Sequence, residues 1–303
     1  MDNNLRVLVA TDYSTAAQTA ERYAISFVKH TGSYLIFMHA YDSSKASEKI
    51  SREGLRQKKL EDLKAHCHKA IEKAGLKPGE LMYETIVLDG PVDQRIKWEA
   101  ETADASLVFM GTHHAKGLSE KLFGGHTWKM IKKLRIPILA IPENALFKPL
   151  EHVVFAAQGR EGEISAINFI ASFLEKFKAD LTGLHVIDYS LADETEDNLF
   201  RKFEKNVNEK VKYDKLSFKR TNGKTVTEGL ETYCQENTVD WLVMCHEQRT
   251  LLERILIPDL SITRKMSFNT NVPLLAVPDY YDPKYADLWK LFKPDAEQLQ
   301  DEF

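Results

Sequence analysis

The chain contains the same order of strand-like and helix-like segments twice, and this internal repeat limits its fold more than any other feature. The run RVLVATD at residues 6–12 returns as HVVFAAQ at 152–158, and an amphipathic helical pattern follows each. The next strand-like runs are LIFMHAYD at 35–42 and LTGLHVID at 181–188, with Leu, His and Asp at identical spacing. A repeat of this length indicates two related domains in tandem.

The later segments repeat as well, and the last strand-like run is PILAIP at 137–142 and PLLAVP at 273–278. Strands that alternate with helices indicate parallel βαβ units, because a parallel pair needs a long crossover. The strand-like runs are continuously apolar, which is typical of strands covered by helices on both faces. The sequence therefore predicts an α/β protein with two tandem, doubly wound, five-stranded parallel-sheet domains of Rossmann-like type.

The connection PENALFKP at 142–149 separates the two halves. We therefore expect a first domain at 1–147, a second at 148–281 and a C-terminal tail at 282–303. The tail has no counterpart in the first half, and its pattern indicates one short helix.

Composition excludes several classes of protein. The 303 residues carry a net charge of -4 with both signs interspersed, which argues against a nucleic-acid groove or a basic membrane-binding face. Cys67, Cys234 and Cys245 form no CxxC pair, which favours a reducing cytoplasm without disulfides. The absence of a long apolar run or a signal-type start also favours a cytoplasmic protein without a membrane span.

Ligands of open parallel sheets bind beyond the carboxyl ends of the strands, where the strand order reverses. The loop GTHHAKGLSEKLFGGHT at 111–127 follows the fourth strand and leads into a helix whose free amides favour a phosphate. Thr127 either adds a hydroxyl donor or caps this helix, and any strand-to-helix turn uses glycine. The candidate nucleotide-binding residues are Ala10, Thr11, Asp12, Ala40, Met110, Gly111, His114, Gly117, Gly124, Gly125 and Thr127.

Asp12, His39, the glycine-rich loop and PILAIP together resemble the universal stress protein family, over residues 4–142 and again over 151–278. This resemblance implies an adenine nucleotide alpha hydrolase-like fold and an ATP-binding loop of the form G-x-x-G-(x)9-G-S/T. It also implies that Asp12 contacts the sugar or base and that the backbone at Ala40 contacts the ligand.

The chain departs from that loop at two positions. Gly111 and Gly124 match the first and third glycines, whereas His114 and Gly125 replace the second glycine and the Ser or Thr. The imidazole of His114 either intrudes on the phosphate or donates to it. Loss of the hydroxyl at position 125 removes one donor, which weakens binding by about 1 kcal/mol.

The second half departs further. Gln158 replaces Asp12, and the loop at 245–263 contains no glycine. The apolar residues at 251–257 predict a packing surface there instead of a triphosphate pocket. We therefore expect only the first half to bind a nucleotide.

Several polar residues have a structural interpretation beside a functional one. Asp12 either contacts a ligand or caps the following helix, and both roles are compatible. The repeat of His39 as His185 favours a hydrogen bond at the end of the second strand over catalysis. His113, His114 and His126 lack the fixed spacing of metal ligands, so we expect no metal site.

Cys245 replaces a glycine at a strand end and is interpreted as a small buried residue, because no histidine and acid can be assigned to activate it as a nucleophile. The sequence therefore identifies no catalytic residue.

The resemblance implies a cytoplasmic stress-response protein that binds ATP, AMP or another adenine nucleotide, with or without Mg²⁺, and has at most slow ATP hydrolysis. It also implies an intramolecular pseudo-dimer in which the last strands pair, and it leaves open a homodimer and an unidentified protein partner. Two alternatives remain at this point. One is an interaction scaffold with both nucleotide sites degenerate, and the other is a weak ATPase.

Overall fold

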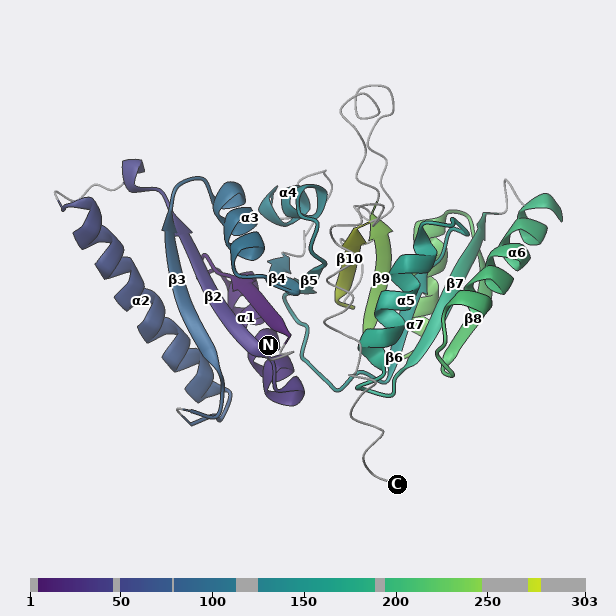
Figure 1. The fold of residues 1–303 in the computed structure, drawn as a ribbon, viewed down its shortest axis with the longest axis horizontal. Coiled ribbons are helices and arrows are strands. Elements are labelled where there is room, and N and C mark those ends of the chain that lie inside the picture. The colour runs from purple at the N-terminus through teal and green to yellow at the C-terminus, as the bar shows by residue number, and fades with distance from the viewer. Residues whose placement is uncertain are drawn as a thin grey trace, which may run out of the picture.

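One continuous sheet of ten strands runs through the molecule. The computed structural model describes residues 5–45, 50–77, 79–112, 125–188, 194–246 and 272–278. The strand order is β3-β2-β1-β4-β5-β10-β9-β6-β7-β8, so each half supplies five neighbouring strands (Figure 1). The fold class predicted from the repeat is confirmed.

The first half alternates strands with helices from its first strand to its last. Its elements are β1 (Arg6–Ala10), α1 (Thr15–Thr31), β2 (Tyr34–Tyr41), the short 3-10 helix η1 (Ser43–Lys45), α2 (Arg52–Lys73), β3 (Tyr83–Asp89), α3 (Val92–Thr102), β4 (Leu107–Thr112), α4 (Gly125–Lys133) and β5 (Ile138–Pro142).

The second half repeats this order. Its elements are β6 (His152–Ala156), α5 (Glu163–Leu174), β7 (Asp180–Asp188), α6 (Glu194–Lys210), β8 (Leu216–Gly223), α7 (Val226–Glu236), β9 (Trp241–His246) and β10 (Leu274–Pro278). The domain boundary expected at residue 147 lies in the connection between β5 and β6. The expected apolar loop at 251–257 and the tail at 282–303 lie outside the described residues.

Local sequence explains where the helices begin and end. The hydroxyl of Ser14 accepts a hydrogen bond from the backbone N–H of Ala17 and caps α1. Gly32 ends the same helix in the left-handed conformation at φ 67°, and its N–H donates to the carbonyl of Val28. Ser51 caps α2 in the same manner, by accepting from Gly54.

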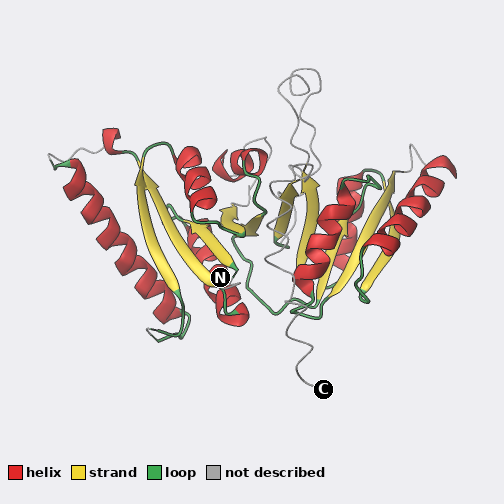
Figure 2. Ribbon diagram, viewed as in Figure 1, coloured by secondary structure: helices red, strands yellow, loops and turns green. Residues whose placement is uncertain are grey.

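Helices cover both faces of the sheet (Figure 2), which buries the central strands, whereas the edge strands β3 and β8 are partly exposed. The core on one face contains side chains of α1, α2, α5 and α6, and the core on the other contains side chains of α3, α4 and α7. No helix in the described part of the chain is both long and apolar enough to span a bilayer.

The two halves join where β5 and β10 pair antiparallel, with Leu275 beside Leu139. Beneath this junction the indole N–H of Trp241 donates to the hydroxyl of Tyr23 at 2.7 Å, and both side chains are buried. The Phe27 ring stacks on the rings of Phe173 and Trp241, at centroid distances of 6.3 and 5.9 Å. The expected intramolecular pseudo-dimer is therefore present as one continuous sheet with a shared aromatic core.

The repeated histidines occupy matching places in the two halves. Nδ1 of His39 lies 2.9 Å from the carbonyl oxygen of Thr11, and Nδ1 of His185 lies 3.0 Å from that of Ala157. Because a carbonyl only accepts, each Nδ1 carries the proton. Burial lowers the pKa of His39, which favours the neutral ring. The predicted structural role of both histidines, tying the second strand to the first, is confirmed.

Candidate functional site

A cavity of about 150 Å³ opens at the carboxyl ends of β1, β2 and β4. This is the point in the first half where the strand order reverses between β1 and β4. It is lined by Ala10, Thr11, Asp12, Ser14, Ala16, Ala17, Met38, Ala40, Val92, Ile96, Met110, Gly111, His126 and Thr127.

Most of the site residues expected from the sequence meet in this cavity. Gly125 is the first residue of α4, and His114, Gly117 and Gly124 lie outside the described residues. The expected residues that line the cavity are Ala10, Thr11, Asp12, Ala40, Met110, Gly111 and Thr127.

Gly111 is required by the close approach of α1 to the end of β4. A Cβ atom at this position would lie 2.2 Å from the carbonyl oxygen of Ala16, which no side chain tolerates without backbone movement. The strand pairing places Cys245 at the corresponding position in the second half, beside Val277 as Gly111 lies beside Ile141. The glycine therefore allows α1 to form one wall of the cavity.

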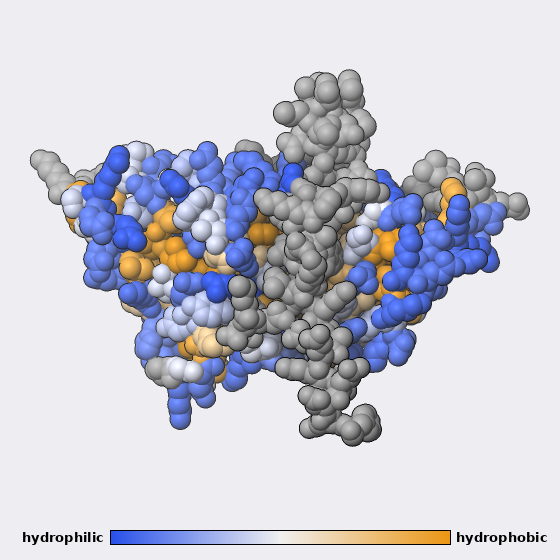
Figure 3. Space-filling view, viewed as in Figure 1, coloured by the Kyte–Doolittle hydropathy of each residue, from blue (hydrophilic) through white to orange (hydrophobic). Residues whose placement is uncertain are grey.

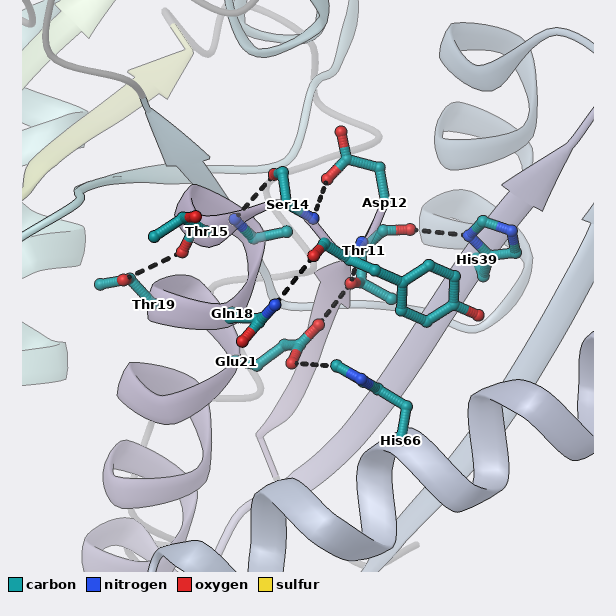
Figure 4. Close-up of polar contacts among 11 residues, drawn as sticks. Thr11, Asp12, Ser14, Thr15, Gln18, Thr19, Glu21, His39 and His66 are labelled. Atoms are coloured by element: carbon teal, nitrogen blue, oxygen red, sulfur yellow. Dashed lines mark hydrogen bonds and ion pairs between the residues drawn. The ribbon is translucent and has the colours of Figure 1, made fainter.

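The loop between β1 and α1 is held by its own polar side chains (Figure 4). The carboxylate of Asp12 accepts a hydrogen bond from the N–H of Ser14 at 3.0 Å, while Ser14 caps the helix. The side chain that caps α1 is thus mainly that of Ser14 and not that of Asp12. The exposed Asp12 side chain lies at the wall of the cavity.

A buried carboxylate supports this loop from below. Glu21 is 1% exposed and accepts hydrogen bonds from the hydroxyl of Thr11 and, at 2.7 Å, from Nε2 of His66 on α2 (Figure 4). Sequence reasoning did not identify Glu21 or His66. The available signal was a charged residue within the apolar stripe of α1, between Ala20 and Ala24.

Helix α4 begins three residues earlier than the sequence pattern predicted, so Thr127 lies inside it. The proposed helix-capping role of Thr127 is therefore wrong. Its buried hydroxyl instead donates to the carbonyl oxygen of Gly111 at 3.2 Å, which ties α4 to the end of β4. Residues 125–127 thus form the first turn of α4, where the sequence pattern indicated a loop.

One end of the cavity carries positive charge. Nδ1 of His126 lies 2.6 Å from one carboxylate oxygen of Asp93 on α3. The ammonium groups of Lys129 and Lys133 lie 3.7 and 4.0 Å from the other oxygen. Two lysines around one carboxylate leave a net positive charge beside this end, which favours an anion.

The matching loop of the second half is arranged differently. The carboxylate of the buried Glu163 accepts hydrogen bonds from the backbone N–H groups of Gln158, Gly159 and Arg160. Burial raises the pKa of Glu163 to about 7, against the effect of these donors. In the second half, the counterpart of the loop that carries Asp12 is therefore closed on a carboxylate of the protein itself.

Cys245 is half-buried instead of fully buried as expected, and it packs at the edge of the α1/α5 face of the core. Among the described residues, no cluster of three or more His, Cys, Asp or Glu side chains is arranged to hold a metal ion.

The first half is thus a doubly wound α/β domain with a cavity at the switch point of its sheet. Residues 3–142 match the universal stress protein family. The first domain therefore belongs to this family, and the second half repeats its fold. No curated protein matches the chain.

Solved structures show the same two-domain arrangement. A universal stress protein from Archaeoglobus fulgidus covers 92% of this chain and 100% of its own, with 17% identity and a TM-score of 0.70. A putative universal stress protein from Pseudomonas aeruginosa covers 95% of this chain and 97% of its own, with 14% identity and a TM-score of 0.56. At these identities the likeness establishes the fold.

Shorter family structures match about half of the chain. One is a universal stress protein in complex with cAMP, which covers 46% of this chain and 98% of its own, with 15% identity and a TM-score of 0.36. Nucleotide binding is thus known for that member of the family.

Proposed function

We propose that the first domain binds one adenine nucleotide in the cavity at the ends of β1 and β4. The observation that carries this proposal is the meeting of Asp12, Ala40, Gly111 and Thr127 in one cavity at the switch point of the sheet. These residues come from four different elements or loops, so their convergence is a property of the fold and not of the local sequence.

The chemistry of the cavity walls suits the two ends of a nucleotide. Met38, Ala40, Val92 and Ile96 offer apolar surface for a planar base. The carboxylate of Asp12 is the only acidic group among the described lining residues and suits a ribose hydroxyl as hydrogen-bond acceptor.

The phosphates would lie toward α4. The first amides of this helix, together with His126 and Lys129, supply donors and positive charge at that end. Mg²⁺ would enter with ATP, held by the phosphates, because Asp12 alone does not form an all-protein magnesium site.

The second domain is proposed to bind no nucleotide. Gln158 stands where Asp12 stands, and Cys245 stands where Gly111 allows the helix to approach. Helix α5 also starts two positions later than α1, relative to the matched histidine contacts, so its first turn does not form an equivalent wall. The expected stoichiometry is one nucleotide per chain.

Calorimetric titration of ATP, ADP and AMP into the purified chain tests this function. We expect saturable binding at one site, weakened at least about tenfold in Asp12→Ala, since a lost hydrogen bond to a charged acceptor contributes about 1.5–3 kcal/mol. Gln158→Ala, at the matching position of the second domain, is the control and leaves affinity unchanged. Absence of binding up to millimolar nucleotide would instead support the interaction-scaffold function.

A weak ATPase is the second candidate function, and the His126–Asp93 pair favours it. The carboxylate holds the proton on Nδ1 of His126, which leaves Nε2 as a base at the wall of the cavity. A turnover number at saturating ATP that falls to the background in His126→Gln, beyond any loss of nucleotide affinity, would establish this activity. Turnover equal in both proteins would exclude His126 as the base.

A further inference from the structure

A chain of hydrogen bonds fixes the residues on either side of Asp12 (Figure 4). The N–H of Tyr13 donates to the hydroxyl oxygen of Thr11 at 3.1 Å, and this hydroxyl donates to one oxygen of Glu21. The other oxygen of Glu21 accepts from Nε2 of His66 at 2.7 Å. The chain thus connects the loop at the cavity with α2, and every donor in it has an acceptor.

Helix α2 lies at the edge of the molecule, where the visible surface is mostly hydrophilic (Figure 3). Most of its charged side chains are exposed, whereas the side chain of His66 is only 24% exposed and contacts the Glu21 carboxylate, which is 1% exposed. A carboxylate at this depth destabilises the fold unless donors satisfy its oxygens. Thr11 and His66 satisfy Glu21 in this way, so removal of either partner leaves one of its oxygens unpaired.

The second half shows that the fold does not require this buried pair. The matched histidine contacts align Thr11 with Ala157, and the same spacing aligns Glu21 with the buried Ile167. Two phenylalanines of α1 and α5 that stack across the junction follow this spacing as well. Both polar partners are therefore apolar in the half whose loop carries Gln158 in place of the aspartate.

The two loops are also held from different sides. In the second half the Glu163 carboxylate accepts from the N–H groups of 158–160. Glu163 aligns with Ala17, which lines the cavity of the first half, so its carboxylate stands on the cavity side of the loop. Among the described residues that line that cavity, neither Glu21 nor His66 is included. The first half thus holds its loop from behind and leaves the cavity open.

The backbone of the loop has a conformation that its surroundings must hold. Tyr13 has φ 64°, in the left-handed region that disfavours a residue with a Cβ, whereas the aligned Gly159 adopts φ 83° without this penalty. The Tyr13 ring centroid lies 4.7 Å from that of His39 and 4.9 Å from that of His66. His66 therefore fixes the loop through ring packing as well as through the carboxylate.

We propose that Glu21 and His66 are positioning residues of the nucleotide site. They hold the residues that flank Asp12, so that its exposed carboxylate is directed to a ribose hydroxyl before the nucleotide binds. The pair belongs to the half that keeps an open cavity, and apolar residues replace the carboxylate and its hydroxyl partner in the half that closes the matching loop on Glu163. This inference rests on the nucleotide site proposed for the first domain.

A double variant, Thr11→Ala with Glu21→Ile, copies the second half and removes the buried carboxylate together with its hydroxyl partner. We expect its urea midpoint to equal or exceed that of the native chain, because apolar residues that replace a buried polar pair are often neutral or stabilising. Its ATP affinity in calorimetric titration should fall about three- to tenfold, as for one lost hydrogen bond. A clearly lower midpoint would assign the pair to folding, and unchanged affinity would show that it positions nothing; either result overturns the inference.

In an Asp12→Ala background the same double variant should change ATP affinity by less than about twofold, because the pair acts through the Asp12 carboxylate. This non-additivity separates positioning from a direct contact of Thr11 with the nucleotide and from a general loosening of the domain. Losses that add in the triple variant would overturn the proposal.

His66→Phe keeps an aromatic ring beside Tyr13 but removes the donor to Glu21, and ATP affinity should again fall about three- to tenfold. His66→Gln should bind ATP more tightly than His66→Phe, since its side-chain amide can donate in place of Nε2. His68→Phe is the matched control on the same helix, because His68 is 53% exposed, and it should leave affinity unchanged. Native affinity in His66→Phe, or the same loss in His68→Phe, would contradict the positioning role.

Hydrogen exchange of the Tyr13 amide, measured by NMR without nucleotide, separates this inference from the proposed function. We expect faster exchange in His66→Phe than in the native chain, because the hydrogen-bond chain that holds this N–H is broken. If the native chain binds no ATP, the nucleotide function fails, while faster exchange would still establish that the pair holds the loop. Unchanged exchange would overturn the inference whether or not ATP binds.

Discussion

A single missing methyl group at Gly111 decides whether a helix can approach the end of a strand. The sequence showed this glycine as part of a loop motif, which suggests backbone freedom near a phosphate. The structure gives a different reason, because a Cβ would overlap the carbonyl oxygen of Ala16. Gly111 therefore shapes the cavity by its packing against α1.

Gly111→Ala should lower the free energy of unfolding by about 1–3 kcal/mol, because the added methyl displaces the backbone of α1. It should also weaken nucleotide binding. Urea unfolding and nucleotide titration measure the two effects. Gly54→Ala in α2 is the control, since the atoms nearest to its Cβ would be side-chain atoms of Ile50 and Ser51 and not backbone, and alanine favours a helix. Equal stability of the two variants would contradict the packing role.

Glu163 links the stability of the second half to pH. Its pKa is raised to about 7 in the folded chain from an ordinary value of 4.5. Between these values the folded protein binds more protons than the unfolded chain. The free energy of unfolding therefore falls as pH rises from about 4.5 to about 7, by up to about 3 kcal/mol from this group.

In Glu163→Gln this contribution disappears. We expect the stability of the native chain, relative to the variant, to fall across that pH window and to stay level above pH 7. Urea unfolding at several pH values measures the difference. Parallel stability curves for the two proteins would show that the carboxyl group titrates normally.

At the scale of elements, the structure joins segments that are far apart in the sequence. Helix α1 contacts β9 of the other half through the Tyr23–Trp241 hydrogen bond, and Phe27 stacks on the same indole. Nothing in the periodicity of α1 separates a residue facing its own sheet from one facing the second half. The helix was predictable from its amphipathic pattern, but its partner was not.

Tyr23→Phe should destabilise the chain by about 1–3 kcal/mol, because it leaves the buried indole N–H of Trp241 without an acceptor. Thermal unfolding and the indole ¹⁵N resonance report the change. Tyr233→Phe is the control, since the buried hydroxyl of Tyr233 has no hydrogen-bond partner in the described structure and its loss costs nothing. A destabilisation of similar size in both variants would argue against the inter-domain hydrogen bond.

At the scale of the whole molecule, a single chain covers sheet edges that two separate one-domain chains would cover by forming a dimer. The antiparallel pairing of β5 with β10 covers one edge of each half. The shared aromatic core lies beneath this pairing and includes Phe147 of the connection, whose ring centroid is 5.4 Å from that of Tyr23. The connection is thus part of the interface between the halves.

A fragment of residues 1–147 should therefore form a homodimer through β5. Removal of the second half exposes the β5 edge together with Tyr23 and Phe27, and two copies can cover these surfaces by twofold symmetry. Sedimentation equilibrium measures the mass of the fragment beside that of the full chain. A fragment that stays monomeric at its highest soluble concentration would contradict the expectation.

The sequence by itself determined the repeat, the alternation of strands and helices, and the positions that end the strands. These follow from local periodicity and from two copies of one pattern, so Asp12, Ala40 and Gly111 could be named as one site. It also paired His39 with His185 through their equal spacing. The start of α4 was misplaced because glycine, histidine and threonine have weak helix preference, whereas Thr127 bonds to Gly111 only in the folded chain.

Only the tertiary structure decided which surfaces meet. Glu21, His66 and the Tyr23–Trp241 pair come from distant segments, and their contacts depend on how the layers pack. The exchange of Tyr13 for Gly159 is visible in the aligned sequences, but the packing of Phe200 of α6 against His185, beside Gly159, is not. The alternation of strands and helices follows from periodicity, whereas cavities depend on close packing, in which a single side chain fills or opens the space.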